Sequence, residues 1–404
     1  MDINLSLSLS LSLLPILLLA TPTPVPPIHT RLALTGLGAG ATGTGHRHRL
    51  SYYLSLCISA LTLCLGLQTP LNPTALNQGE YPACAALTTG YVFRVENAAT
   101  VAFLQKMTRT GWLTRFVVRS VGDAEGEDGT KSHFRSDSQP RGSGTSSNST
   151  SQRRSSSSPH LSMACLPTIA LLSWIISSTC SSSDAVRVSP PLVLSFTLLL
   201  LSRVLATIAF LERTRTRANP QWHGAPEPGV PGDLLILLSE DRWARMTGPV
   251  DDLKAVTSGR WLACRRSEGP APRVLSLPVL MGCLDWMASM MVWMAVVALG
   301  GASDLEKATL VGAVIAGHLI LVYENARAEE LVMNGRIVRV AKAPDALKRY
   351  ARRLDMAEEL IREVGRGDFA VRLGMINPEQ VQGMGKDHGN DDDNDETRNE
   401  VVTM

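Results

Sequence analysis

The chain has 404 residues, of which 45% are hydrophobic, and its formal net charge is +2. A chain of this length can hold two or three soluble domains or one membrane unit with several spans. The seven cysteines are odd in number and include no CxxC pair, which argues against a disulfide framework and against a structural zinc site.

The chain begins with a low-complexity leader, residues 1–51. Residues 5–20 resemble the apolar core of a signal peptide, but no basic residue precedes them. A cleaved signal, a signal anchor and a leading exon foreign to the protein all remain open for this segment. Residues 36–45 contain a GxGxxG pattern, but no acidic residue follows about 20 positions on, as a dinucleotide site requires. We therefore interpret them as a flexible linker.

Residues 52–67 form a short candidate membrane span. The polar stretch that follows, residues 68–160, is predicted to be a largely disordered linker, because its second half is rich in serine and has no core-forming residues. Within it, residues 100–120 mix apolar and basic side chains. This composition suits either a helix lying in the membrane interface or an ordinary surface helix.

Four later segments have the length and apolarity of spanning helices: residues 161–179, 190–211, 275–299 and 307–323. We therefore predict an all-α polytopic membrane helix bundle with a four-span core, residues 161–323, and five or six spans if earlier segments also cross. The loop 212–274 carries ten lysines and arginines, clustered against both adjacent spans. The positive-inside rule predicts that this loop and the C-terminus are cytosolic.

The region 324–377 is predicted to be a cytosolic amphipathic helical region, followed by a disordered acidic tail, residues 378–404. The apolar residues of region 324–377 are spaced alternately three and four positions apart, as in a coiled-coil seam. They are Leu347, Tyr350, Leu354, Ala357, Ile361 and Val364. The seam suits either packing on the chain's own loop 212–274 or binding of a cytosolic protein partner through residues 340–370. Its basic side chains (Lys348, Arg349, Arg352 and Arg353) also suit contact with anionic lipid.

Two long strings carry a resemblance to a known group of proteins. They are EPGVPGDLLILLSEDRWARMTGPVDDLKAVTSGRWL and NGRIVRVAKAPDALKRYARRLDMAEELIREVGRGDFAVRLGMI. Over residues 190–377 the chain resembles a group of uncharacterised fungal integral membrane proteins. The resemblance implies a fungal multi-pass membrane protein, and it brings with it no activity and no residue roles.

Three ionisable residues lie within the predicted spans: Arg203, Asp285 and His318. Such groups are costly in a bilayer unless they are paired or functional. Counted from the cytosolic ends of their helices, they lie about 12, 15 and 7 Å deep at the helical rise. We predict an ion pair between Arg203 and Asp285. The pair is either a structural strut between two spans or, with His318, part of a proton or ion path.

The last span also carries Ala308, Gly312 and Ala316 at four-residue spacing, a stripe of small residues typical of close helix contact. No nucleophile with a base, no metal-ligand spacing and no phosphate loop accompanies the polar cluster, so we assign no catalytic residue, cofactor or metal. The predicted function is a non-enzymatic structural or scaffold role, with the lipid bilayer as partner and no nucleic acid. The alternative is an ion- or proton-coupled transporter of small solutes that uses the three ionisable residues.

Overall fold

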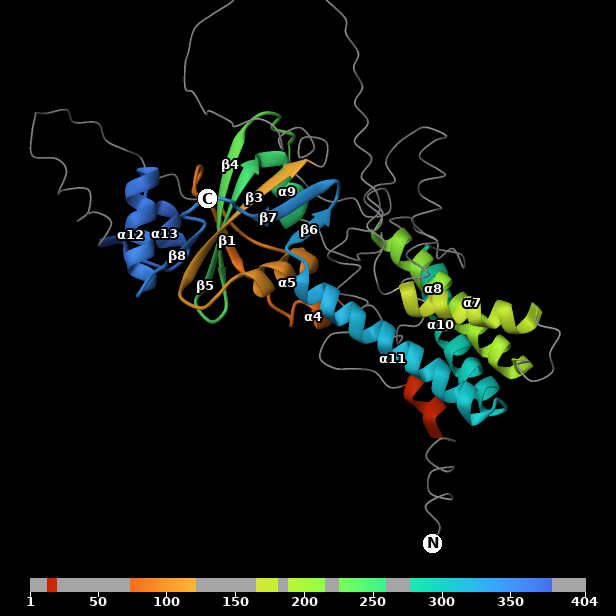
Figure 1. Ribbon diagram of the computed structural model, residues 1–404. Coiled ribbons are helices and arrows are strands. Elements are labelled where there is room, and N and C mark those ends of the chain that lie inside the picture. The colour runs from red at the N-terminus through yellow and green to blue at the C-terminus, as the bar shows by residue number, and fades with distance from the viewer. Residues whose placement is uncertain are drawn as a thin grey trace, which may run out of the picture.

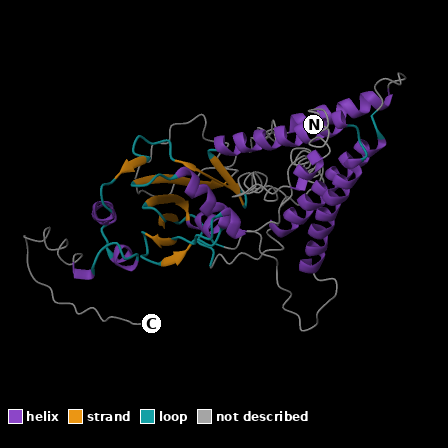
Figure 2. Cartoon of the chain, turned by 90° about the horizontal axis from the view of Figure 1, so that it is seen from below, coloured by secondary structure: helices purple, strands orange, loops and turns teal. Residues whose placement is uncertain are grey.

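The computed structural model describes residues 13–19, 73–120, 165–180, 188–214, 225–258 and 277–379. These residues form two parts, a β-sheet with helices on both faces and a bundle of long apolar helices beside it (Figure 1). Figure 2 shows the same separation from below, with the strands confined to one part. We call these the sheet domain and the bundle.

The sheet has eight strands that come from three separate parts of the chain. They are β1 (Ala83–Ala86), β2 (Val92–Arg94), β3 (Trp112–Ser120), β4 (Pro231–Leu238), β5 (Arg242–Pro249), β6 (Glu330–Met333), β7 (Arg336–Val340) and β8 (Leu347–Arg349). Their spatial order is β2-β1-β4-β5-β3-β7-β6, and β8 pairs with the start of β3. β3 and β5 run parallel, whereas the other neighbouring strands are antiparallel.

Helices cover both faces of the sheet. They are α4 (Pro73–Leu76), α5 (Ala98–Met107), α9 (Val250–Thr257), α12 (Arg353–Val364) and α13 (Asp368–Arg372). On one face, α5 and α9 bury Phe103 and Val256 against Met246 of β5. On the other face, α12 and α13 pack on Leu235 of β4 and Trp243 of β5. The sheet is therefore the middle layer of three.

The prediction of an all-α fold is wrong. Residues 73–120, predicted within a disordered linker, form three strands and two helices. The loop 212–274 contains β4, β5 and α9. In the region 324–377, predicted to be helical, three strands follow the end of α11. The cause is visible in β4, where Leu234, Leu235 and Ile236 are consecutive and all buried. A strand covered on both faces loses the alternation of apolar and polar residues, and its sequence then reads like a helix.

The turn between β6 and β7 shows a strand signal that the helical interpretation missed. Asn334 and Gly335 have φ angles of 50° and 73°, in the left-handed region. An Asn-Gly pair between two apolar runs is the preferred sequence for a two-residue hairpin of type I′. The string LVMNGRIVRV alone therefore predicts a β-hairpin.

The bundle consists of four helices at the predicted places: α7 (Cys165–Cys180), α8 (Pro190–Thr214), α10 (Leu277–Gly300) and α11 (Asp304–Arg327). Within the described part of the chain, α8, α10 and α11 are long and apolar enough to cross a membrane, whereas α7 is a shorter apolar helix. A 3₁₀ helix, η1 (Leu14–Leu19), lies against α10 and α11. The candidate span 52–67 lies outside the described residues.

Two serine hydroxyls fix α8 against α10. Ser195 Oγ donates to the carbonyl oxygen of Ala295 at 2.6 Å, and Ser202 Oγ donates to that of Ala288 at 2.7 Å. Because the residue number rises along α8 as it falls along α10, the two helices are antiparallel. Around these bonds the bundle has an apolar core to which η1, α7, α8, α10 and α11 all contribute.

The bundle and the sheet domain are joined through the ends of α8 and α11. Phe210 of α8 and Leu321 of α11 are each 1% exposed and belong to the hydrophobic core beneath the sheet. From α5, Lys106 Nζ donates to the carbonyl oxygens of Asn325 and Ala328, at 2.5 Å each. A cation at the carbonyls of a helix C-terminus is a stabilising cap, so the end of α11 is anchored in the sheet domain.

Candidate functional site

Arg203 lies on the buried side of α8. It is 4% exposed and follows Leu192, Phe196 and Leu199, which are buried at helical spacing on the same stripe. The stripe points into the bundle, so the guanidinium group is held in its interior. Arg203 is therefore part of the contact between the helices of the bundle.

Asp285 lies on the side of α10 that faces α8. It comes four residues after the buried Met281 and three before the buried Ala288. The serine bonds set Arg203 level with Met287, which puts Arg203 and Asp285 about 3 Å apart along the helix axis. The two charges thus occupy one level on adjoining helices, and their ion pair stays a prediction.

His318 enters the same region from α11. It lies one helical turn before Leu321, the residue buried in the core of the sheet domain. Both of its ring nitrogens are buried, and neither has a hydrogen-bond partner among the described residues. The polar residues therefore gather at the end of the bundle that adjoins the sheet domain.

The small-residue stripe of α11 does not make the close contact expected of it at Gly312. This glycine is exposed, and no described residue lies within 4 Å of the place where a Cβ would be. Ala308 and Ala316, on the same stripe, are only partly buried. The core of the bundle is formed instead by the neighbouring side of α11, through larger side chains such as Leu310 and Val314.

The predicted seam divides between a strand and a helix. Leu354, Ala357, Ile361 and Val364 lie on α12 and belong to the core that contains Leu235 and Trp243. Packing of this helix on segment 212–274 is therefore confirmed. The helix does not extend back to the start of the seam, because Leu347 lies in β8 and Tyr350 in the turn after it. The elements β8 and α12 lie on the side of the sheet domain away from the bundle (Figure 1).

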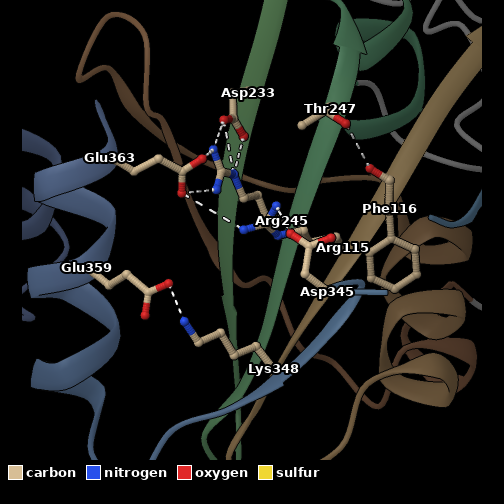
Figure 3. Close-up of polar contacts among 9 residues, drawn as sticks. All are labelled: Arg115, Phe116, Asp233, Arg245, Thr247, Asp345, Lys348, Glu359 and Glu363. Atoms are coloured by element: carbon tan, nitrogen blue, oxygen red, sulfur yellow. Dashed lines mark hydrogen bonds and ion pairs between the residues drawn. The ribbon is translucent and has the colours of Figure 1, made fainter. Parts of the chain in front are cut away.

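A network of charges joins α12 to the sheet (Figure 3). Arg245 of β5, with 8% of its side chain exposed, binds Asp233 of β4 through Nη2–Oδ2 at 2.6 Å and Glu363 of α12 through Nη1–Oε2 at 2.7 Å. Burial lowers the pKa of Arg245, but hydrogen bonds to the two carboxylates outweigh it, and the net pKa is raised. The bond from Arg245 lowers the pKa of Glu363.

The network continues along the same face of the sheet (Figure 3). Arg115 of β3 binds Asp345 at 2.6 Å, and Lys348 of β8 binds Glu359 of α12. Tyr350 also bonds to Glu359, and burial together with this bond raises the pKa of the phenol. Each carboxylate of the network is bound by a cation, so none is placed as a general base. The arrangement joins α12 to the sheet.

The sequence prediction did not include Arg245, Asp233 or Glu363. The sequence signal that could have identified them is the alternation of side chains along β5. Trp243 and Arg245 share one face of the strand, and the buried Ala244 and Met246 occupy the other. An arginine beside a tryptophan on a covered face must have acidic partners, because an unpaired buried charge is costly. That deduction requires the strand to be recognised first.

Within the described ranges, no three or more His, Cys, Asp or Glu side chains are grouped to hold a metal ion. No family model, curated protein or solved structure matches this chain. Function is therefore inferred from the two parts of the molecule and from the surfaces they present.

Proposed function

We propose that this protein is a multi-pass membrane protein that holds a folded α/β domain against the cytosolic face of a bilayer, in a structural or scaffold role. The observation that carries the proposal is the contrast between two surfaces. In α10, Trp286, Trp293 and Val297 are 63%, 55% and 77% exposed. Large apolar surface of this kind is unfavourable in water and ordinary against lipid.

The sheet domain has a different surface. Among its described residues the exposed large hydrophobic side chains are Tyr81, Tyr91 and Val230, which lie in connections, and Leu347 in β8. Single exposed hydrophobic residues are normal on a protein that faces water. The contrast supports a bundle within lipid and a sheet domain outside it.

The path of the chain supports four crossings. The chain leaves the sheet after β3 and returns to it at β4, and α7 and α8 lie between these strands. The chain leaves the sheet domain again after α9 and returns at β6, and α10 and α11 lie between. An intact sheet lies on one side of a bilayer, since open sheet edges are not tolerated in hydrocarbon. Each excursion then crosses an even number of times, so α8 requires a partner span.

The apolar helix available as that partner is α7. Its 16 residues extend for about 24 Å at the helical rise. This is less than the roughly 30 Å of a hydrocarbon core, a mismatch that local thinning of the bilayer accommodates at modest cost. The basic residues beside the spans, such as Arg213, Arg265 and Arg273, support a cytosolic sheet domain.

Epitope tags test this topology. One tag is inserted between residues 183 and 184, in the connection from α7 to α8, and a second follows residue 404. We expect antibody to reach the second tag once the plasma membrane alone is opened, and the first only when all membranes are dissolved. Native Asn148 should remain unglycosylated. Equal access to both tags would contradict the four-span arrangement.

Ion- or proton-coupled transport is a second candidate, and it is favoured by the buried ring nitrogens of His318, to which no described residue is hydrogen-bonded. Asp285→Asn distinguishes the two functions. A transporter would keep its expression and lose a pH-dependent flux in vesicles. A strut would lose expression and recover it in the double variant Arg203→Leu, Asp285→Leu, because neither charge is then left alone in the bundle.

A further inference from the structure

β8 is an open edge of the sheet. It pairs with β3 on one side, and no other described strand pairs with it. Tyr350 N donates to the carbonyl oxygen of Gly111 at 3.0 Å, so the backbone groups of residue 350 face β3. Because this direction alternates along an antiparallel strand, the N–H and C=O groups of Leu347 and Arg349 point outward. All three residues of β8 are exposed.

The open edge lies among basic side chains. Lys342, Arg349 and Arg352 are exposed, and none of them forms an ion pair with a described residue. The neighbouring Lys348 and Arg353 are already bound, by Glu359 and Asp241. Three cations beside unpaired backbone groups form a surface suited to an extended acidic segment, which would bind through main-chain hydrogen bonds and through charge.

The same chain contains such a segment. Residues 387–400 carry seven carboxylates and a single basic residue, Arg398. We propose that this acidic tail docks in extended form on the open edge of β8, with its carboxylates beside Lys342, Arg349 and Arg352. The proposal does not depend on how many times the bundle crosses a membrane.

Reach and attachment favour the chain's own tail over a separate acidic protein. The described chain ends at Glu379, just after α13, which shares a core with α12; α12 in turn is bound to β8 through Lys348 and Glu359. The residues from 379 to 391 extend for up to about 40 Å. A domain of this size is about 35 Å across. The acidic run can thus reach β8, and attachment gives it a millimolar effective concentration there.

Hydrogen exchange of the full-length protein in lipid nanodiscs tests the proposal. The outward amides of Leu347 and Arg349 are compared between the wild type and a variant with Asp391→Asn, Asp392→Asn and Asp393→Asn. We expect these two amides to exchange about tenfold faster in the variant, since an occupied edge is protected and a vacant one is not. Unchanged amides in α12 show that the domain remains folded.

A matched variant separates charge from substitution. Asp391→Glu, Asp392→Glu and Asp393→Glu keep the charge, and we expect exchange as slow as in the wild type. A peptide of residues 385–400 added in trans to the asparagine variant should restore the protection. Protection that persists in the asparagine variant itself overturns the proposal, because the edge is then covered by another protein or protected without the tail.

Discussion

Two nearly buried arginines stand where layers of the molecule meet. Arg245 lies between the sheet and α12, and Arg203 lies inside the bundle. A buried cation contributes little net stability when it is paired, but removing one partner leaves the other charge without compensation in a poorly solvated place. Among charged residues, these two positions are therefore ones at which a single substitution has a large expected cost.

Arg245→Ala tests this at the sheet. The substitution leaves Asp233, with 18% of its side chain exposed, next to Glu363 without their shared cation. We expect the free energy of unfolding of the sheet domain to fall by about 3 kcal/mol. Urea denaturation followed by tryptophan fluorescence measures the change. Arg362→Ala, at an exposed position of α12, is the control and should change stability by less than about 0.5 kcal/mol. Equal losses in the two variants would contradict the role of the network.

At the scale of elements, the docking of α13 on the turn between β1 and β2 depends on one glycine. Gly90 has a φ of +71°, and a Cβ there would lie 1.9 Å from Asp368 Oδ2. Arg366 holds that carboxylate and also donates to the carbonyl oxygen of Thr88 at 2.6 Å. The turn, the linker before α13 and the start of α13 therefore fit together only without a side chain at residue 90.

Gly90→Ala and Gly335→Ala form a matched pair that isolates this contact. Both glycines have left-handed backbones, and an alanine costs about 1–2 kcal/mol there. Gly335 has nothing within 4 Å of a Cβ, so only Gly90→Ala also displaces Asp368. We expect the melting temperature to fall further in Gly90→Ala, and α13 amides to exchange faster in that variant alone. Identical behaviour would show that the contact contributes nothing.

The sequence predicts the helices of this protein far better than its strands. The four bundle helices were predicted within a few residues, because a long apolar run has few alternatives. β3 was interpreted as helical because basic side chains interrupt its apolar pattern; one of them, Arg115, has its partners Asp345 and Glu363 far along the chain. β4 could not be recognised as a strand because its residues are buried on both faces. The Asn334-Gly335 turn, by contrast, is a local sequence signal from which the hairpin of β6 and β7 could have been predicted.

The candidate site was predictable in a similarly divided way. Charges inside apolar runs led to the prediction of Arg203, Asp285 and His318, and helix rise placed the first two at similar depths. The serine bonds give the register of α8 and α10, and a functional role for the three residues stays a prediction. The position of all three near the sheet domain could not be predicted from the sequence. It depends on Phe210 and Leu321, which pack in the core of a sheet that the sequence analysis did not predict.

At the scale of the whole molecule, the bundle and the sheet domain are coupled through α11. The helix runs from the far end of the bundle into the sheet domain (Figure 1), and its C-terminal carbonyls are capped by Lys106. A displacement of α11 in the bundle is therefore transmitted to β6, which follows it after two residues. The amine of Lys106 is a polar contact that helps to secure this end of the helix.

Lys106→Met keeps the apolar stem and removes the cap. We expect the amides from residue 325 to 330 to exchange several-fold faster, because losing such bonds costs about 1 kcal/mol locally. The control is Lys254→Met, which also removes a bond to a backbone carbonyl, that of Ala225, and leaves the end of α11 untouched. If both variants exchange alike at residues 325–330, the cap is not what secures α11.

The interleaved sheet has a consequence for biosynthesis. β3 ends at Ser120, and its antiparallel neighbour β7 begins at Arg336, so the intervening residues and four apolar helices must be made before the two can pair. At about 5–20 residues per second, the edge of β3 waits about 10–40 s on the ribosome. An unpaired, strongly apolar edge is a template for aggregation during that time. The order of synthesis therefore leaves this edge of β3 without its neighbour until β7 has been translated.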